Sequence, residues 1–284
     1  MPPFLSPKGG MGELVAALEQ RLHTAGASIQ LNTSALDISP FSLLDGREAG
    51  GEGLQHGYRV ILEDGQEIEG DAVILATPAH ATAPLLANIA PDVAQDLTAI
   101  PHASTAIVSL AYRRHDIPHP LNSHGYVVPR VAGGAILAGT WSSRKWANRA
   151  PEGWELLRVF IGRSGQDGDL MAADDDALIA LARSEVRTRL GVEAPPSLSR
   201  VQRWPLGMPQ YVLGHPERIA RIEAAMRNHP GLALAGNAYR GVGIPDCIAS
   251  GEAAARAILP VLLAATSSAA TEEQSTTPSS QERD

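Results

Sequence analysis

The sequence predicts an α/β protein, and two observations support this prediction. Residues 232–255 read as a strand of small apolar residues, a glycine-rich loop and a helix that begins near Pro245. Residues 105–161 contain four runs rich in β-branched and aromatic residues, separated by turns, namely 105–112, 125–129, 135–141 and 156–161. The first pattern is a strand, loop and helix unit, and the second indicates a mixed or antiparallel sheet.

The N-terminal part predicts a helix followed by a strand. Leucines at positions 14, 18 and 22 recur at four-residue intervals, which predicts a helix over 12–25 with one buried stripe. Gly26 ends this helix. Residues 28–33 alternate polar and apolar side chains, as a half-buried strand does.

Two further strands are expected before residue 80. Residues 58–62 form the first, and residues 67–76 form the second after a hairpin turn at 63–66. Pro78 ends the second strand because proline cannot donate to the ladder. Residues 45–57, which contain several Gly and Glu, are expected to form an exposed loop before these strands.

A helix is also expected over 174–190, where apolar residues recur at helical spacing. Acidic residues at 174–176 stand at its start, where negative charge is favourable, and Gly191 follows its end. Successive carboxylates diverge and no oxygen-rich loop accompanies them, so helix capping explains them and no metal site is expected. The Ser- and Thr-rich residues 266–284 have little to bury and are expected to be disordered.

Composition and charge exclude several classes of protein. The 284 residues are 44% hydrophobic and 19% charged, which suffices for a substantial core. A formal charge of -8 with dispersed Arg and Lys argues against a nucleic-acid partner, because that needs a concentrated basic surface. The single Cys247 excludes an intramolecular disulfide framework and a multi-cysteine zinc site. This cysteine usage fits a reducing cytoplasm, which is the expected location.

No segment predicts a secretory signal or a membrane-spanning helix. The first seven residues are too short and too broken by proline for a signal. The most apolar windows, 73–91 and 254–265, are interrupted by prolines, a histidine or charged residues. Neither window offers about 20 uninterrupted apolar residues. Peripheral membrane contact and a homodimer both stay open.

Hydrolytic chemistry is not supported. The sequence has no Gly-x-Ser-x-Gly, and its nine histidines lack a zinc-protease spacing. His215 is expected to be structural, as a hydrogen-bonding group in the loop after Tyr211. No catalytic residue is assigned.

Five segments together resemble one known family. Residues 232–255, with Gly236-Asn237 and Gly243-Ile244-Pro245, closely resemble the C-terminal flavin-binding motif of protoporphyrinogen oxidases. That family lies in the superfamily of monoamine oxidases and phytoene desaturases. Further similar segments are 4–14 and 71–79, and segments similar to the porphyrinogen branch itself are 139–151 and 203–215.

The resemblance implies an incomplete FAD-binding Rossmann-like domain plus a mixed β-sheet substrate domain. The FAD-binding domain would combine residues 1–80 and 231–265, and the substrate domain would occupy residues 81–230. The sequence contains no Gly-x-Gly-x-x-Gly, the loop whose amides hold the FAD pyrophosphate in such domains. We therefore expect the C-terminal part of a longer oxidase, which by itself binds FAD weakly or not at all.

The family pattern also implies which residues contact FAD. The main chain of Ala35 would contact adenine, and three residues after a strand, Ala76, Thr77 and Pro78, would lie near the flavin. Gly236 and Asn237 would approach the ribityl and pyrophosphate portion. The isoalloxazine edge would be lined by Gly243, Ile244 and Pro245, with the Ile244 N–H directed at the pyrimidine carbonyl. Without a flavin, Ala76, Thr77 and Pro78 would simply end a buried strand at a proline. The glycine-rich loop would then be a turn whose glycines serve only tight packing.

The implied reaction is the oxidation of a porphyrinogen, with protoporphyrinogen as the first choice and molecular oxygen as the electron acceptor. Broad apolar contact would come from Trp141, Trp146 and Met208, and the propionates would meet Arg144 and Lys145. Alternatively, the apolar residues pack in an ordinary core, and the charges of Arg144 and Lys145 are solvated. Coproporphyrinogen as substrate, a related flavoprotein acting on amines or carotenoids, and an inactive half of a fold also stay open.

Overall fold

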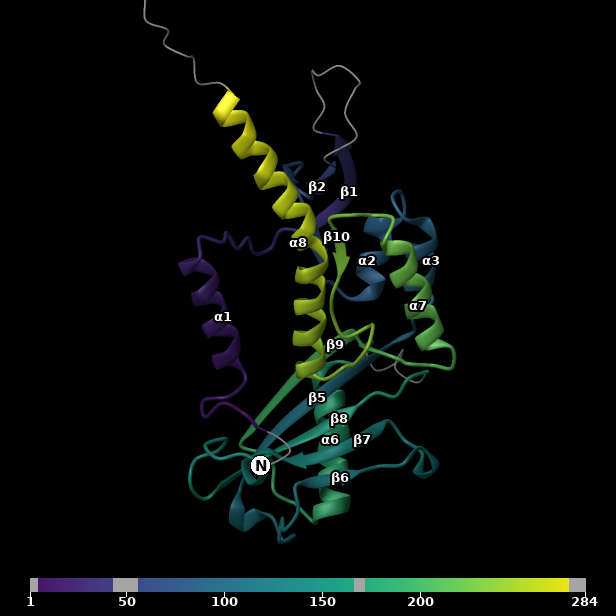
Figure 1. Ribbon diagram of the computed structural model, residues 1–284. Coiled ribbons are helices and arrows are strands. Elements are labelled where there is room, and N and C mark those ends of the chain that lie inside the picture. Colours follow the sequence, from purple (N-terminus) through teal and green to yellow (C-terminus); the bar gives the residue numbers. More distant parts are fainter. Residues whose placement is uncertain (1–4, 43–55, 166–171, 276–284) are drawn as a thin grey trace, which may run out of the picture. The chain divides into compact units, whose positions relative to one another are not determined.

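A computed structural model describes residues 5–42, 56–165 and 172–275, which form a mixed α/β protein with three sheets (Figure 1). The chain divides into two compact units. One comprises Met1–Gln30 and His102–Met208, and the other comprises Leu31–Pro101 and Pro209–Asp284. These boundaries differ from those expected near residues 80 and 230, and the functions expected of the two domains stay predictions.

The first unit is built on a five-stranded sheet with the strand order β6, β7, β8, β5, β9. The pairs β6–β7, β7–β8 and β5–β8 are antiparallel. The four strands expected in the middle of the chain are thus confirmed, with the bounds β5 His102–Arg113, β6 Gly125–Val127, β7 Ile136–Trp141 and β8 Trp154–Ile161. The fifth strand, β9 (Leu198–Pro209), was not predicted from the sequence. Short helical turns between strands are η1 Arg114–Asp116, η2 Arg130–Ala132 and α4 Ser142–Lys145.

One face of this sheet is covered by α6 (Asp175–Leu190), which forms as the sequence predicts. Asp174 caps it, since its Oδ1 accepts a hydrogen bond from Ala177 N at 2.7 Å. Gly191 ends it in the left-handed conformation, at φ 70°. The buried side of α6 packs with alternate residues of β5 and β8, because a strand presents every second side chain to one face.

The N-terminal helix α1 (Gly12–Thr24) confirms the expected helix, but its apolar stripe is not buried. Of the expected stripe, Leu18 is 56% exposed and Leu22 is 46% exposed. The expected burial is therefore wrong within the described residues, because none of their elements covers this face. The strand expected over 28–33 is also wrong: these residues pair with no described strand, and Leu31 is 76% exposed.

The second unit contains an antiparallel sheet of β1 (Ala35–Ser42), β2 (His56–Leu62) and β3 (Glu67–Gly70). The expected hairpin turn between β2 and β3 is confirmed, and Gly65 lies in it at φ 82°. A loop was expected over 45–57, and its residues 45–55 lie outside the described residues.

A second, parallel sheet in this unit pairs β4 (Val73–Leu75) with β10 (Leu232–Leu234). The sequence predicts one strand over 67–76, which is wrong. A bend at Asp71 separates β3 from β4, and β4 finds its hydrogen-bonding partner in β10.

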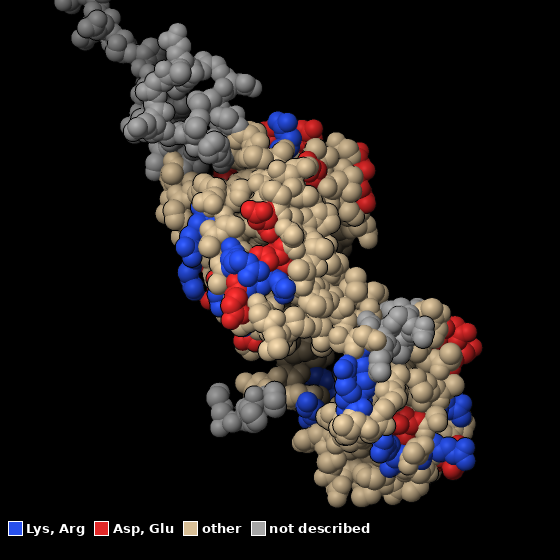
Figure 2. Space-filling view, turned by 90° about the vertical axis from the view of Figure 1, so that its right-hand side faces the viewer, with Lys and Arg blue, Asp and Glu red and all other residues tan. Residues whose placement is uncertain are grey.

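Three helices build a core against this parallel pair. They are α2 (Ala79–Leu86), α3 (Pro91–Thr98) and α7 (His215–Met226). Their apolar side chains join those of Leu75 and Leu232 in one buried cluster. On the surface, Arg221 of α7 binds both carboxylate oxygens of Asp96 of α3, at 2.6 and 3.1 Å. Figure 2 shows basic and acidic side chains intermixed on the visible face.

The C-terminal helix α8 (Ile244–Ser275) packs on β10 through Ala254, which contacts Ala233 and Ala235. By length and composition, its segment Ile244–Ala264, with a mean hydropathy of 1.5, could cross a membrane. The sequence did not predict this, because the apolar window at 254–265 covers only part of this helix. The helix reaches Ser275, so the disorder expected from residue 266 is wrong over 266–275. Alanine and glutamate there favour continued helix.

Candidate functional site

The candidate site lies where β4 and β10 end. The strands are parallel, so their carboxyl ends meet at one edge, the edge at which parallel α/β sheets bind ligands. The pairing extends one step beyond β10, because Ala235 N donates to Leu75 O at 2.9 Å. The next residues, Ala76 and Gly236, therefore lie side by side at this edge, and a Cβ on Gly236 would lie 4.0 Å from Ala76 O.

Gly236 has a conformation that side chains rarely adopt, with φ 132°. Its amide donates to Ser250 Oγ at 3.1 Å, and Ser250 lies in the second turn of α8. This bond fixes the end of β10 against the beginning of α8. The two parts of the expected flavin motif, Gly236-Asn237 and Gly243-Ile244-Pro245, are thus held together by a contact within the same unit.

The loop before α8 is closed by Asp246. Its Oδ2 accepts a hydrogen bond from Gly243 N at 3.1 Å, so a side-chain oxygen satisfies an amide near the helix N-terminus. A Cβ on Gly241 would collide with the same carboxylate, and one on Gly243 would lie 2.9 Å from Asp246 Oδ2. Glycine at these two positions leaves room for that carboxylate.

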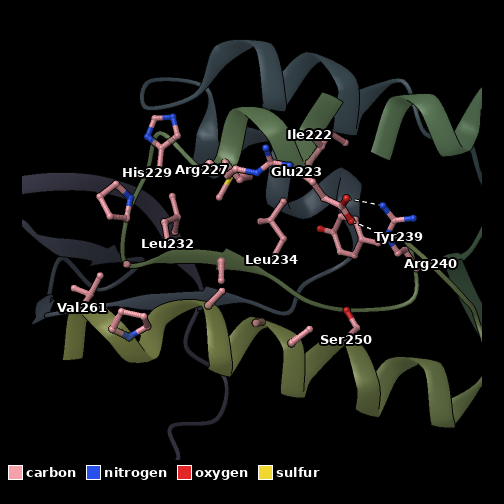
Figure 3. A pocket seen from close by; sticks show the side chains of 18 of the residues that line it. Ile222, Glu223, Arg227, His229, Leu232, Leu234, Tyr239, Arg240, Ser250 and Val261 are labelled. Atoms are coloured by element: carbon pink, nitrogen blue, oxygen red, sulfur yellow. Dashed lines mark hydrogen bonds and ion pairs between the residues drawn. The ribbon is translucent and has the colours of Figure 1, made fainter. Parts of the chain in front are cut away.

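A cavity of about 670 Å³ lies between α7, β10 and α8 (Figure 3). All three residues of β10 line it, as do Tyr239 and Ser250. In the described residues β10 has one hydrogen-bonded neighbour, β4. Parallel sheets usually have more than two strands with helices on both faces. The cavity therefore lies where a further strand could pair with β10, and its walls are apolar as such a strand requires.

Charged and aromatic groups close one end of this cavity. Arg240 donates to both carboxylate oxygens of Glu223, at 2.7 and 2.5 Å. Burial raises the pKa of Tyr239 to about 12. His215 Nε2 hydrogen-bonds with Tyr239 O at 3.0 Å, and its ring stacks on Tyr211 with centroids 4.0 Å apart. The expected hydrogen-bonding role of His215 after Tyr211 is confirmed.

The other residues expected to contact FAD are accessible at this edge. Ala76, Thr77 and Pro78 are exposed, and Pro78 immediately precedes α2. Asn237 is partly buried, and its carbonyl accepts a hydrogen bond from Tyr211 Oη at 2.7 Å. Ile244 and Pro245 are exposed in the first turn of α8. Ala35 instead begins β1 in the antiparallel sheet, and its adenine contact stays a prediction.

This edge has chemistry that suits the ring end of a flavin. The first turn of α8 offers backbone N–H groups and the positive end of a helix dipole, which suit an electron-rich carbonyl edge. Gly236 lets the backbone approach a ligand closely. Two amides, those of Gly236 and Gly243, are already bonded to Ser250 and Asp246, so they are not free donors in this conformation.

The residues expected to contact the substrate lie in the first unit, whereas this edge belongs to the second unit. Trp141 is 2% exposed and packs in the core on the α6 side of the sheet. Arg144 forms an ion pair with the buried Glu155 at 2.5 Å. Lys145 lies 5.5 Å from the ring centroid of Trp146. Met208 is 47% exposed on β9. Their contact with a substrate stays a prediction.

Sequence reasoning missed Ser250, Asp246 and the hydroxyl of Tyr211, although each stabilises the candidate site. The spacing of Asp246, three residues after Gly243, is the spacing of a helix cap and could have indicated its role. No local pattern points to Ser250 or Tyr211, because their partners lie 14 and 26 residues away.

The fold and this edge indicate a flavin-dependent α/β protein, and comparison with known proteins agrees. Residues 2–259 match the model of the family described as flavin containing amine oxidoreductase. The chain therefore belongs to the flavin containing amine oxidoreductase family. This membership confirms the expected resemblance and the expected flavin cofactor, FAD.

Similar proteins within this family are named as porphyrinogen oxidases. Coproporphyrinogen III oxidase of Propionibacterium freudenreichii subsp. freudenreichii is 37% identical over 92% of this chain and 46% of its own length. Protoporphyrinogen oxidase of Homo sapiens is 30% identical over 89% of this chain and 51% of its own length. A crystal structure from Exiguobacterium sp. 255-15, provisionally named as protoporphyrinogen oxidase, gives a TM-score of 0.72 at 30% identity, covering 92% and 52% of the two chains. The chain thus spans about half the length of these relatives.

Proposed function

We propose that this chain supplies the flavin-ring edge and the substrate sheet of an FAD-dependent porphyrinogen oxidase, with coproporphyrinogen III as substrate and molecular oxygen as electron acceptor. The observation that carries this proposal is the joined edge of β4, β10 and α8, with Gly236 beside Ala76. Protoporphyrinogen, the first choice from the sequence, is replaced because several similar relatives are named coproporphyrinogen III oxidase. The pathway served would be porphyrin and heme biosynthesis.

The role of this chain's residues is to bind and to orient. When bound, FAD would take electrons from the porphyrinogen and pass them to oxygen, giving hydrogen peroxide. The Ile244 N–H, in the first turn of α8, would donate to the carbonyl edge of the flavin and favour negative charge there. Gly236 would admit the ribityl chain close to the backbone. Ser250 and Asp246 would hold this loop in place before any ligand binds.

The FAD-binding domain is incomplete in this proposal. The sequence has no Gly-x-Gly-x-x-Gly, and the cavity beside β10 has the position that a further parallel strand would take. The part of the relatives' length that this chain does not match would supply that strand and the pyrophosphate loop.

An inactive half of the fold is the second candidate, and one observation favours it. The amides of Gly236 and Gly243 are already bonded to side chains of the same chain, so flavin would have to compete for them. Cytoplasmic location, peripheral membrane contact and a homodimer stay proposals for either candidate.

The test compares the purified chain with the same chain joined to the N-terminal half of the Propionibacterium relative. We expect yellow, FAD-loaded protein and coproporphyrinogen-dependent oxygen uptake from the joined protein alone. Stoichiometric FAD retained by the isolated chain through gel filtration would contradict the proposed incompleteness. A folded, FAD-loaded joined protein that oxidises neither porphyrinogen would leave the inactive half-fold as the better account.

A further inference from the structure

The five-stranded sheet of the first unit has a second face, opposite α6, that carries partly exposed side chains. Over Ser104–Tyr112 of β5 and along all of β8 the residues alternate between buried and partly exposed. The buried set, including Val108 and Val159, packs in the core with α6. The partly exposed set, including Ser109 and Arg158, therefore points to the other face.

Strand register arranges this open face in two rows. In the first row Thr140 of β7, Arg158 of β8 and Ser109 of β5 are direct neighbours. In the second row, two residues along each strand, Ala138, Phe160 and Ile107 are direct neighbours. One row is therefore polar with a single charge, and the adjacent row is apolar.

Arg158 has no counter-ion among the described residues. Its guanidinium carbon lies 5.1 Å from the ring centroid of Phe160, and no described side chain forms a hydrogen bond or ion pair with it. Burial lowers the pKa of its guanidinium, and no nearby carboxylate opposes that shift. An arginine in a protein nevertheless remains charged. By contrast, Arg144 of the same unit is neutralised by Glu155 at 2.5 Å.

An uncompensated, partly buried cation is costly unless something pairs with it. The neighbouring hydroxyls of Ser109 and Thr140 also lack hydrogen-bond partners in the described part of the chain, so the polar row offers several donors to one anion. A planar guanidinium matches a carboxylate with two parallel hydrogen bonds. The apolar row beside it would bury hydrocarbon.

An exposed aromatic on β9 extends the apolar surface. Val201 packs against the core on the α6 side, and Arg203 bonds to Ala173 O at 2.6 Å just before α6. Strand alternation then places Trp204, which is 52% exposed, on the open face. Tryptophan and arginine are both enriched among the residues that dominate binding surfaces.

We propose that Arg158 binds a carboxylate of the substrate, whose apolar body lies over Phe160 and Ile107. This inference rests on the proposed function, since porphyrinogens are apolar macrocycles with carboxylate side chains. It moves the anionic contact from Arg144 and Lys145, the residues expected from the sequence, to the centre of the open sheet face.

The experiment uses two stable oxidised probes, coproporphyrin III and its tetramethyl ester, which lacks free carboxylates. Binding to the full chain is titrated by the shift of porphyrin absorbance and by quenching of tryptophan fluorescence. The variants are Arg158→Met, which keeps the length of the side chain without its charge, and Arg158→Lys. The matched control is Arg187→Met on α6, which removes the same charge from an exposed position on the covered side of the sheet.

We expect the wild-type chain to bind the free acid more tightly than the ester. Arg158→Met should weaken binding of the acid about 10-fold or more and leave the ester unchanged, because one charge-assisted contact is lost. Arg158→Lys should recover part of the affinity, and Arg187→Met should bind as wild type does. Circular dichroism of each variant checks that it is folded.

Two results would overturn the inference. If Arg158→Met binds the acid as tightly as wild type, the carboxylate site is not at Arg158, and the proposed function stands. If the wild-type chain binds acid and ester equally, or neither of them, this face does not recognise carboxylates. The proposed function is then judged separately, by FAD loading and oxygen uptake of the joined protein.

Discussion

The Gly236 amide donates to the Ser250 hydroxyl at 3.1 Å, and this bond joins the end of β10 to the second turn of α8. The two residues are 14 positions apart, with the whole glycine-rich loop between them. The bond therefore fixes the span of the loop that the proposed flavin site uses.

Ser250→Ala should loosen this loop and destabilise the chain. Loss of the hydrogen bond costs about 1 kcal/mol, partly offset by the better helix propensity of alanine, so the net loss is roughly 0.5–1 kcal/mol. Urea unfolding measures it. Ala249→Ser, one residue earlier and exposed, is the control for helix propensity. Equal stability of Ser250→Ala and wild type would show that the bond does not hold the loop.

Two glycine-to-alanine substitutions should change the stability of the chain in opposite directions. Gly236→Ala forces a side chain into φ 132°, and it should destabilise the chain by about 1–3 kcal/mol. Gly251→Ala lies in α8 with no atom within 4 Å of the added Cβ, and it should stabilise by about 0.5–1 kcal/mol. Thermal unfolding of both variants checks the pair. A stabilising Gly236→Ala would mean that the observed conformation of Gly236 is not required.

Local signals predicted the elements that carry a pattern of their own in the sequence, such as a helix cap, a glycine stop or a run of β-branched and aromatic residues. The cap at Asp174, the stop at Gly191 and the middle strands all form as expected. The predicted strand over 67–76 failed because its second part pairs with β10, which lies more than 150 residues further along the chain. No local sequence pattern predicts that the chain leaves the β2–β3 sheet and pairs with β10.

The candidate site was predictable in its backbone and not in its side chains. The glycine-rich loop and the start of α8 follow from the sequence, since glycine and a helix start carry local signals. Arg144 and Lys145 were selected for the substrate because they are charged and lie in a family-like segment. Arg158 was not, because its row with Thr140 and Ser109 exists only through the register of three strands.

Tyr239 should make the stability of the chain depend on pH in the alkaline range. Burial raises its pKa to about 12, above the value of 10.0 for an unperturbed tyrosine. The unfolded state therefore loses the phenol proton first, so the contribution is complete below pH 10.0 and is lost as the pH rises towards 12. The slope is about 1.4 kcal/mol per pH unit.

Comparison of wild type with Tyr239→Phe isolates this group from other titrating residues. Urea unfolding at pH 8, 10 and 11, chosen to span roughly the range of tyrosine titration, should show wild type losing stability faster than the variant above about pH 10. Parallel curves for the two proteins over that range would mean that Tyr239 is not shifted by burial.

Gly243→Val should impair oxidation of a porphyrinogen by the joined protein more than it impairs folding. The backbone of Gly243 does not lie in the left-handed region that favours glycine, so a side chain there causes no strain of the dihedral angles. The physical reason is instead steric: a Cβ would lie 2.9 Å from Asp246 Oδ2, and the larger valine would push that carboxylate and the first turn of α8 away. If this displaces the Ile244 N–H from the flavin, the rate should fall about 100-fold or more. Thermal unfolding is the control for folding, and a normally folded variant with wild-type FAD occupancy and turnover would remove this loop from the flavin site.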